Sequence, residues 1–411
     1  MNEKMLFMTP LQCAYMLERS RDNGVPCRVY MEFKTDCTEL GCLRKAWIEL
    51  FRIHPVMRAR CDQCGFMDIP PFDPDDCGRS FTVWNTGSDL RSLISYRKLD
   101  VENNHACRLH AVCSGNNVER IVFELELVIC DVHSFLLIMH DLADVYSAFH
   151  KGIVCSIPPD DLSSAAQVPD KKRIAAAKDY WISRLSGANT VFPFAMRSGY
   201  DKAGAEGYED ICGEIDSAAA YSLMRIAEKL GTDLEELLLL AFCHAVMKYT
   251  GSHELIVNYP FCVRNEDNFN IAADLTRCML FRCRLDDNDD LADFIRFAHD
   301  DYRSDMLNSC FDGLEAQKLL KSGNNNKYPV PLVFSPSLTI PIETDTSREA
   351  VGSIEYIISS TPGVLLDAQT YRKNGGLFFT WVVPTDVLDM DQVRTAFSLF
   401  LNDIDKLIKL E

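Results

Sequence analysis

The clearest pattern in the chain is a strand-like alternation that passes directly into a helical one. From Arg120 to Ile129 the apolar residues of one face recur at every second position, which is the period of a β-strand. From Phe135 to Val145 apolar residues recur at spacings of three and four, which indicates an amphipathic helix. Ser134 is well placed to cap this helix. The pattern therefore predicts a strand, a short turn and a helix.

Two carboxylates interrupt this apolar stretch. Glu126 lies in the predicted strand, and Asp131 lies at the turn before the helix. Burying a carboxylate costs free energy unless it is paired or used. Spacing alone leaves two interpretations open. Either Glu126 is solvated on a sheet edge and Asp131 is part of a helix cap, or both belong to a functional site.

Similar patterns predict mixed α/β structure in both halves of the chain. The segment Lys151–Lys172, with its three prolines, is the expected connection between two structural units. Helices are expected at 9–19, 40–53, 218–230, 234–249 and 290–306 and after Thr385 or Asp386, and strands at 28–33, 107–113, 210–215, 254–258 and 329–334.

Composition narrows the function classes. The net charge of -18 argues against nucleic acid and against anionic membrane surfaces as partners. No apolar run approaches the ~20 residues of a membrane span. The start of the chain has no signal-peptide pattern, so a cytoplasmic protein is predicted.

The 17 cysteines predict reduced thiols rather than a disulfide framework. Several lie in apolar segments, where cysteine behaves as a small hydrophobic residue: Cys113, Cys130, Cys243, Cys262, Cys278 and Cys283. The spacing of Cys61, Cys64 and Cys77 hints at zinc ligands, but no fourth ligand follows at a suitable distance. The sequence therefore predicts no bound metal and no bound cofactor.

The segment Glu126–Ser134 resembles a family motif. It has the form E-x-x-x-x-D-x-x-S, and the heterocyclization domains of nonribosomal peptide synthetases have D-x-x-x-x-D-x-x-S. Condensation domains have H-H-x-x-x-D-G at the same place. In that alignment the two histidines would be Glu126 and Leu127 and the glycine Val132, so the chain resembles the cyclization variant.

Further segments resemble motifs of the same family, in the family's order, from Met8 to Trp381. His54 falls in one of them, although a histidine at a helix end is the simpler interpretation of that residue. The matches are Met8–Arg19 with L-T-x-x-Q-x-A-Y-x-x-G-R, His54–Ala59 with R-H-x-M-L-R-A, Asn258–Arg264 with N-L-T-L-F-N-R, Pro331–Ser337 with P-V-V-F-T-S, and Ile358–Gln369 with I-S-x-T-P-Q-V-x-L-D-H-Q.

The resemblance implies a fold and an activity. The fold is α/β, with two chloramphenicol-acetyltransferase-like sandwich lobes, expected at residues 1–160 and 161–411, and a channel between them. The activity condenses an acyl donor with cysteine, serine or threonine, both held on the phosphopantetheine of carrier proteins. Cyclodehydration of the product then gives a thiazoline or an oxazoline. The implied partners are the peptidyl and acyl carrier proteins of a nonribosomal peptide synthetase.

The resemblance also implies site residues. The family's cyclodehydration aspartate and threonine fall on Asp367 and Ser335, and the same motif places Gln369 beside them, where it could orient Asp367 or the substrate. Glu126 takes the position of the first motif acid as a further catalytic candidate. On the residues alone, Asp367 could instead be a strand-end acid and Ser335 a turn residue.

Three residues are predicted to be structural at the site. The resemblance implies that Asp131 pairs with Arg264, because the family places their two motifs together. Ser134 is expected to cap the helix that follows Asp131.

Two departures keep alternatives open. Glu126 is one methylene longer than aspartate, and a shift of about 1 Å can cost ~100-fold in rate. Ser335 replaces threonine and precedes a proline. The chain shows no adenylation half and no Gly-Gly-x-Ser carrier motif, so a free-standing heterocyclization enzyme acting in trans is predicted. The alternatives are a condensation-type acyltransferase that does not cyclise and a non-catalytic relative that docks carrier proteins.

Overall fold

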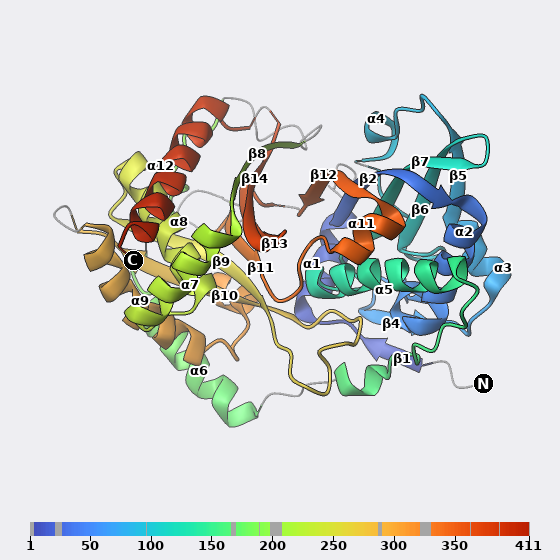
Figure 1. Ribbon diagram of the computed structural model, residues 1–411. Helices are drawn as coiled ribbons and strands as arrows, with labels where there is room; N and C mark the ends of the chain where they lie inside the picture. The colour runs from blue at the N-terminus through green and yellow to red at the C-terminus, as the bar shows by residue number, and fades with distance from the viewer. Residues whose placement is uncertain are drawn as a thin grey trace. The chain divides into compact units, whose positions relative to one another are not determined.

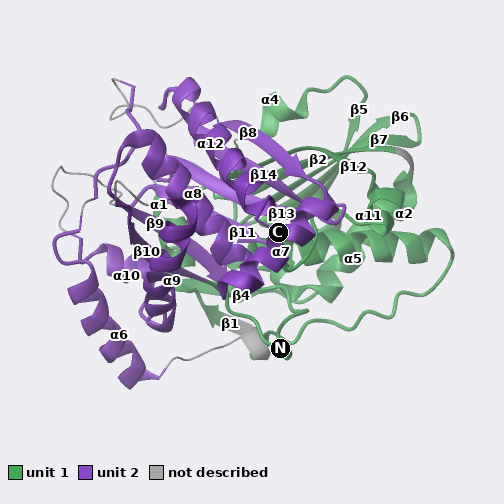
Figure 2. Cartoon of the chain, turned by 60° about the vertical axis from the view of Figure 1, so that its left-hand side comes forward, with its two compact units in different colours: residues 1–167, 262–276, 339–362 green, residues 168–261, 277–338, 363–411 purple. Residues whose placement is uncertain are grey.

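The computed structural model describes most of the chain and divides it into two compact units. The described residues are 4–20, 27–95, 97–165, 170–188, 190–197, 208–286, 290–320, 330–361, 363–385 and 387–410. The N-terminal unit comprises Met1–Gln167, Cys262–Thr276 and Thr339–Pro362, and the C-terminal unit comprises Val168–Phe261, Arg277–Leu338 and Gly363–Glu411 (Figure 2).

The division differs from the predicted boundary between residues 160 and 161. Two segments of the second half of the chain belong to the N-terminal unit, and His133 shows why. Its Nε2 lies 2.8 Å from the Phe269 carbonyl oxygen, and its Nδ1 lies 2.9 Å from Thr339 Oγ1. Local sequence patterns do not reveal such long-range contacts, so the prediction missed both segments.

A five-stranded sheet forms the centre of the N-terminal unit, in the order β12-β2-β7-β6-β5 (Figure 1). All neighbours are antiparallel except β5 and β6. Its strands are β12 (Ser353–Ser360), β2 (Arg28–Glu39), β7 (Asn117–Glu126), β6 (Cys107–Ser114) and β5 (Phe81–Asn85). A smaller sheet joins β1 (Lys4–Phe7), β4 (Phe66–Ile69) and β3 (Arg60–Cys61). The helices are α1 (Pro10–Arg19), α2 (Leu40–Ile53), α3 (Pro74–Cys77), α4 (Leu90–Ile94), α5 (Val132–His150) and α11 (Asp345–Val351).

The two faces of the five-stranded sheet differ in chemistry. On one face, Trp47 and Phe135 from α2 and α5 pack against Phe123, with ring centroids 5.4 and 5.3 Å apart. On the other face, the buried carboxylate of Glu124 lies within 3 Å of Arg28, Arg97 and His110. Burial alone would raise the pKa of Glu124, but these partners lower it to about 2. Ion pairs, rather than apolar packing, therefore stabilise the second face of the sheet.

The predicted strand, turn and helix are present with shifted boundaries. β7 ends at Glu126 rather than at Ile129, because Leu127–Cys130 form the turn. Val128, Ile129 and Cys130 are fully buried there, so the apolar alternation continues past the end of the strand. The prediction that Ser134 caps α5 is wrong. The N-cap residue is Asp131, and Ser134 lies in the first turn, where its amide donates to the Asp131 carboxylate.

The C-terminal unit contains a six-stranded sheet, in the order β10-β9-β11-β13-β14-β8, with α7, α8 and α12 packed along it. Trp381 contacts Phe242 and Phe397 edge to face in its core. Its strands are β8 (Tyr208–Ile215), β9 (Glu254–Cys262), β10 (Thr276–Arg284), β11 (Leu332–Ser337), β13 (Leu366–Lys373) and β14 (Gly376–Pro384). Its helices are α6 (Lys171–Arg184), α7 (Ser217–Leu230), α8 (Leu234–Thr250), α9 (Leu291–Leu307), α10 (Gly313–Gln317) and α12 (Met390–Ile408).

A tight turn joins β13 to β14, where the sequence predicted one. Asn374 and Gly375 both have positive φ, of 53° and 79°, and Lys373 pairs with Gly376 across the turn. Two residues with positive φ match the twist of a hairpin. Asp389 caps α12 instead of Thr385, while Pro329 and the alternative cap Asp386 lie outside the described residues.

The two-unit α/β architecture agrees with the predicted fold class. Each unit has a mixed sheet with helices packed along it. Among the described residues, no helix combines the length and the apolar character that crossing a membrane requires.

The cysteines whose side chains the structure describes are free thiols. Of those predicted to be buried, Cys262 is exposed, because it lies at the end of β9. The others are buried as predicted.

Candidate active site

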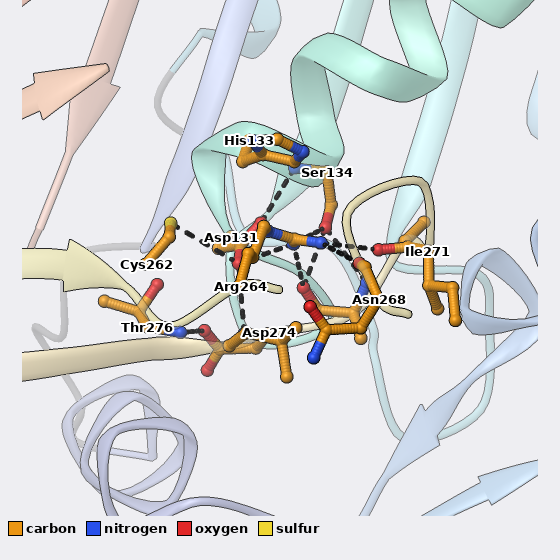
Figure 3. Close-up of polar contacts among 12 residues, drawn as sticks. Asp131, His133, Ser134, Cys262, Arg264, Asn268, Ile271, Asp274 and Thr276 are labelled. Carbon is orange, nitrogen blue, oxygen red and sulfur yellow. Dashed lines mark hydrogen bonds and ion pairs between the residues drawn. The ribbon is translucent and has the colours of Figure 1, made fainter. Parts of the chain in front are cut away.

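The N-terminus of α5 is fixed by a network around Asp131 (Figure 3). The Asp131 carboxylate accepts the N-cap hydrogen bond from the Ser134 amide at 2.7 Å and a second bond from the Leu275 amide at 3.0 Å. Nη2 of Arg264 lies 2.8 Å from both carboxylate oxygens. The predicted contact between Asp131 and Arg264 is thus confirmed, and Asp131 is also the helix cap.

Arg264 and Ser134 extend this network over the segment Cys262–Thr276. Ser134 Oγ accepts a hydrogen bond from Arg264 Nη2 at 2.7 Å and donates one to the Ala273 carbonyl oxygen at 2.7 Å. Nη1 of Arg264 donates to the carbonyl oxygens of Asn268 and Ile271. The side chains of all three predicted structural residues are nearly inaccessible to solvent, so each bond joins buried groups.

Glu126 has bonds of its own at the end of β7. Its carboxylate lies 2.6 Å from Arg19 Nη1 and accepts a hydrogen bond from the Leu99 amide at 2.9 Å. Burial raises the pKa of Glu126, although Arg19 opposes the shift. These bonds run to α1 and to the loop before β6, so they do not link Glu126 to Asp131.

The second set of predicted residues lies in the C-terminal unit, on the adjacent parallel strands β11 and β13. Ser335 of β11 is the register partner of Gln369 of β13, and Val333 is the partner of Asp367. Because residues two apart in a strand share a face, Asp367, Gln369 and Tyr371 lie on one face of the sheet. The structure brings Asp367, Ser335 and Gln369 together, as the family resemblance implied.

A chain of hydrogen bonds fixes the Asp367 carboxyl group. Ser335 Oγ donates to Oδ1 at 2.8 Å, and Gln369 Nε2 donates to Oδ2 at 2.7 Å. The Tyr371 hydroxyl donates to Gln369 Oε1 at 2.8 Å. Burial raises the pKa of Asp367, and the bonds from Gln369 and Ser335 oppose the shift in part. Asp367 is 8% exposed, so its carboxyl group is oriented and poorly solvated. A group with these properties is suited to proton transfer.

Comparisons with known proteins agree with the motifs. The model of the condensation domain matches residues 2–329. This chain belongs to the condensation-domain family. Its relatives in this family include a pyochelin synthetase, PchE, of Pseudomonas aeruginosa, 24% identical over 97% of this chain. The phenyloxazoline synthase MbtB of Mycolicibacterium paratuberculosis is 23% identical over 98% of the chain. The chain spans 29% of the first relative and 36% of the second.

A solved structure of the condensation-domain family has the same fold. The cyclization–docking bidomain of EpoB from Sorangium cellulosum superposes with a TM-score of 0.84, covering 99% of this chain and 85% of that one at 18% identity.

One buried acid of this condensation-domain chain was missed by the sequence analysis. Asp274 accepts hydrogen bonds from Thr9 Oγ1 at 3.3 Å and from the Thr276 amide at 3.0 Å. Burial, with Asp131 as the second cause, raises the pKa of Asp274 to about 7. The signal that drew attention to Glu126, a carboxylate within an apolar run, is also present at Ile271–Leu275 and could have found it.

His54 has the structural role that the sequence suggested. Its two ring nitrogens lie 3.0 Å from Asp141 and 2.9 Å from Asp160. Burial alone would lower the pKa of His54, but these two carboxylates raise it to about 9. The ring is therefore a buried cation that ties α2 to α5 and to the segment after α5.

Proposed function

We propose that this chain is a heterocyclization enzyme that acts on substrates held by carrier proteins. It joins an acyl donor to cysteine, serine or threonine and then closes the side chain onto the new amide, with loss of water, to a thiazoline or an oxazoline. The observation that carries the proposal is the buried Asp367 carboxyl group, oriented by Ser335 and Gln369. The names of two relatives, a phenyloxazoline synthase and a cyclization–docking bidomain, support it.

The Asp367 carboxyl group supplies the proton transfers of ring closure. The attacking side chain must lose a proton, and the hydroxyl that derives from the former carbonyl oxygen must gain one before it leaves as water. A single carboxyl group with a pKa raised toward neutrality can accept the first proton and deliver the second.

Ser335 acts through Asp367 rather than independently. In the structure its hydroxyl donates to the carboxylate. Once Asp367 is protonated this bond can reverse, so that the carboxyl group donates to Ser335 Oγ and Ser335 donates onward to the departing oxygen. Gln369 holds Oδ2, which leaves Oδ1 and the serine as the path of the proton.

Glu126 takes the place of the first motif acid in this proposal, as a further catalytic candidate. Its bonds to Arg19 and Leu99 direct the carboxylate toward neighbours within the N-terminal unit. This observation favours condensation without cyclisation as the second candidate function, because the first acid of the motif is engaged in an ion pair. The proposed partners are carrier proteins of a nonribosomal peptide synthetase, with substrates on phosphopantetheine, in the cytoplasm and without a bound cofactor.

Mass spectrometry of products from the purified chain and loaded carrier proteins tests the proposal. Loss of one water from the linear condensation product means cyclisation. Asp367→Asn should lower ring formation by ~10²–10⁴-fold, the usual cost of removing a positioned acid–base group, while linear product still forms. Ring formation at the wild-type rate in Asp367→Asn would contradict the assignment. Linear product alone from the wild type would establish the second candidate.

A further inference from the structure

Three metal-ligating side chains of different chemistry meet where β2 passes into α2 and where α5 ends. Glu39 is the last residue of β2 and the N-cap residue of α2, Cys42 lies in the first turn of α2, and His150 is the last residue of α5. One ligand atom from each residue lies within 4.8 Å of the other two. All three residues belong to the N-terminal unit.

The separations suit a tetrahedral ion. Glu39 Oε2 lies 3.6 Å from Cys42 Sγ and 3.6 Å from His150 Nδ1. With a Zn–S bond of about 2.3 Å and Zn–N and Zn–O bonds of about 2.0–2.2 Å, adjacent ligand atoms of a tetrahedral zinc site lie roughly 3.4–3.6 Å apart. Small side-chain rotations would therefore bring the three atoms into a coordination shell.

Tyr146 contacts two of the three residues, the imidazole of His150 and the backbone of Glu39. Its ring stacks on the His150 imidazole, with centroids 5.8 Å apart and planes 11° apart, and its hydroxyl accepts a hydrogen bond from the Glu39 amide at 2.9 Å. The stacking orients the His150 ring, and outer contacts of this kind place a ligand before an ion binds.

The cysteines that drew attention in the sequence do not form such a group. Cys61 and Cys77 are buried and Cys64 is exposed, and the three are not gathered as a ligand set among the described residues. Glu39 and His150 are far apart in the sequence, so their spacing gave no signal.

We propose that Glu39, Cys42 and His150 bind one divalent transition-metal ion, with Zn²⁺ as the best fit and water as the fourth ligand. A set of one sulfur, one nitrogen and one oxygen ligand is within the range that zinc accepts. This site departs from the expectation of no bound metal and is independent of the proposed function.

Binding replaces a proton and changes no oxidation state. The Cys42 thiol loses its proton to solvent as the metal–sulfur bond forms, because the thiolate is the form that binds the ion.

A Co²⁺ titration of the purified chain under reducing conditions tests the site. Tetrahedral Co²⁺ with a thiolate ligand gives a charge-transfer band in the near ultraviolet, and we expect it to saturate at one ion per chain and to disappear when Zn²⁺ is added. Cys42→Ser should abolish the band. His150→Gln should weaken binding by at least the ~10–100-fold that is typical even of outer contacts.

Cys64→Ser is the matched control, because Cys64 is an exposed cysteine of the same unit outside the group. It should leave the band unchanged. A second measurement is the rise in melting temperature on addition of Zn²⁺, expected in the wild type and in Cys64→Ser and absent in His150→Gln. The proposal is overturned if the wild type shows no band or if the band survives Cys42→Ser. It is also overturned if Cys64→Ser loses the band to the same extent as Cys42→Ser.

Discussion

Replacing Asp274 with asparagine should stabilise this protein above neutral pH. Asp274 is buried beside Asp131, and its pKa rises from 3.8 to about 7 on folding. The protonated form is therefore favoured in the folded state. The stability that its proton contributes is fully present below the unfolded pKa and is lost as pH rises through about 7.

The structure sets the size of this effect. At 1.36 kcal/mol for each pH unit, a change from 3.8 to about 7 corresponds to about 4 kcal/mol of lost stability at pH 8.5. Asparagine carries no charge at any pH, and its Oδ1 can still accept the hydrogen bond from the Thr276 amide. We therefore expect Asp274→Asn to be about 2–4 kcal/mol more stable than the wild type at pH 8.5 and near wild type at pH 4.

Urea unfolding of both proteins at pH 4, 7 and 8.5 provides the measurement. The difference between the two proteins isolates Asp274, because the other titrating groups are common to both. Asp405→Asn, a charge removal at an exposed acid of α12, serves as the control. A difference between Asp274→Asn and the wild type that stays constant from pH 4 to pH 8.5 would refute the reasoning.

Three further perturbations have expected outcomes. Arg264→Ala should cost ~3–5 kcal/mol, measured as a lower melting temperature, because it strands the buried Asp131 charge, and Arg264→Lys should cost less. The wild type should lose about 3 kcal/mol of stability as pH rises through about 9, because the pKa of His54 is about 9 in the folded state and 6.5 in the unfolded state. His54→Gln should not show this loss, and unfolding measured at pH 7 and pH 10 checks it. Tyr371→Phe removes the hydrogen bond that fixes Gln369 and should slow ring formation on the order of fivefold, equivalent to ~1 kcal/mol, without changing the yield of linear product.

Much of the local structure follows from periodicity, whereas the long-range pairings do not. The alternation before Glu126 and the helical spacing after Ser134 predicted β7 and α5, although the buried turn at Val128–Cys130 misplaced the end of the strand. The contact between Asp131 and Arg264 was predicted only because the resemblance placed the two motifs together.

Other features depend on contacts that no local pattern records. The alternating charges of β2 and β7 resemble those of a solvated face, yet Arg28 and Glu124 are fully buried as a pair. The ion pair of Arg19 with Glu126 joins α1 to the end of β7, and Thr9 donates a hydrogen bond to the buried Asp274. In each case the partner is distant in the sequence, so the cost of burying the charge could not be judged from the chain alone.

The composition of the N-terminal unit has a consequence for synthesis on the ribosome. Residues 1–167 cannot complete their unit when they emerge, because Arg264 and β12 have not yet been made. At a synthesis rate of ~5–20 residues per second, Arg264, the partner of Asp131, is made roughly 5–20 s after residue 167, and β12 is made later still. Until then β2 presents an unpaired edge, which is a template for aggregation. A protein truncated near residue 160 would never gain Arg264 or β12, so the edge of β2 would stay unpaired. The N-terminal half expressed alone should therefore accumulate as insoluble protein.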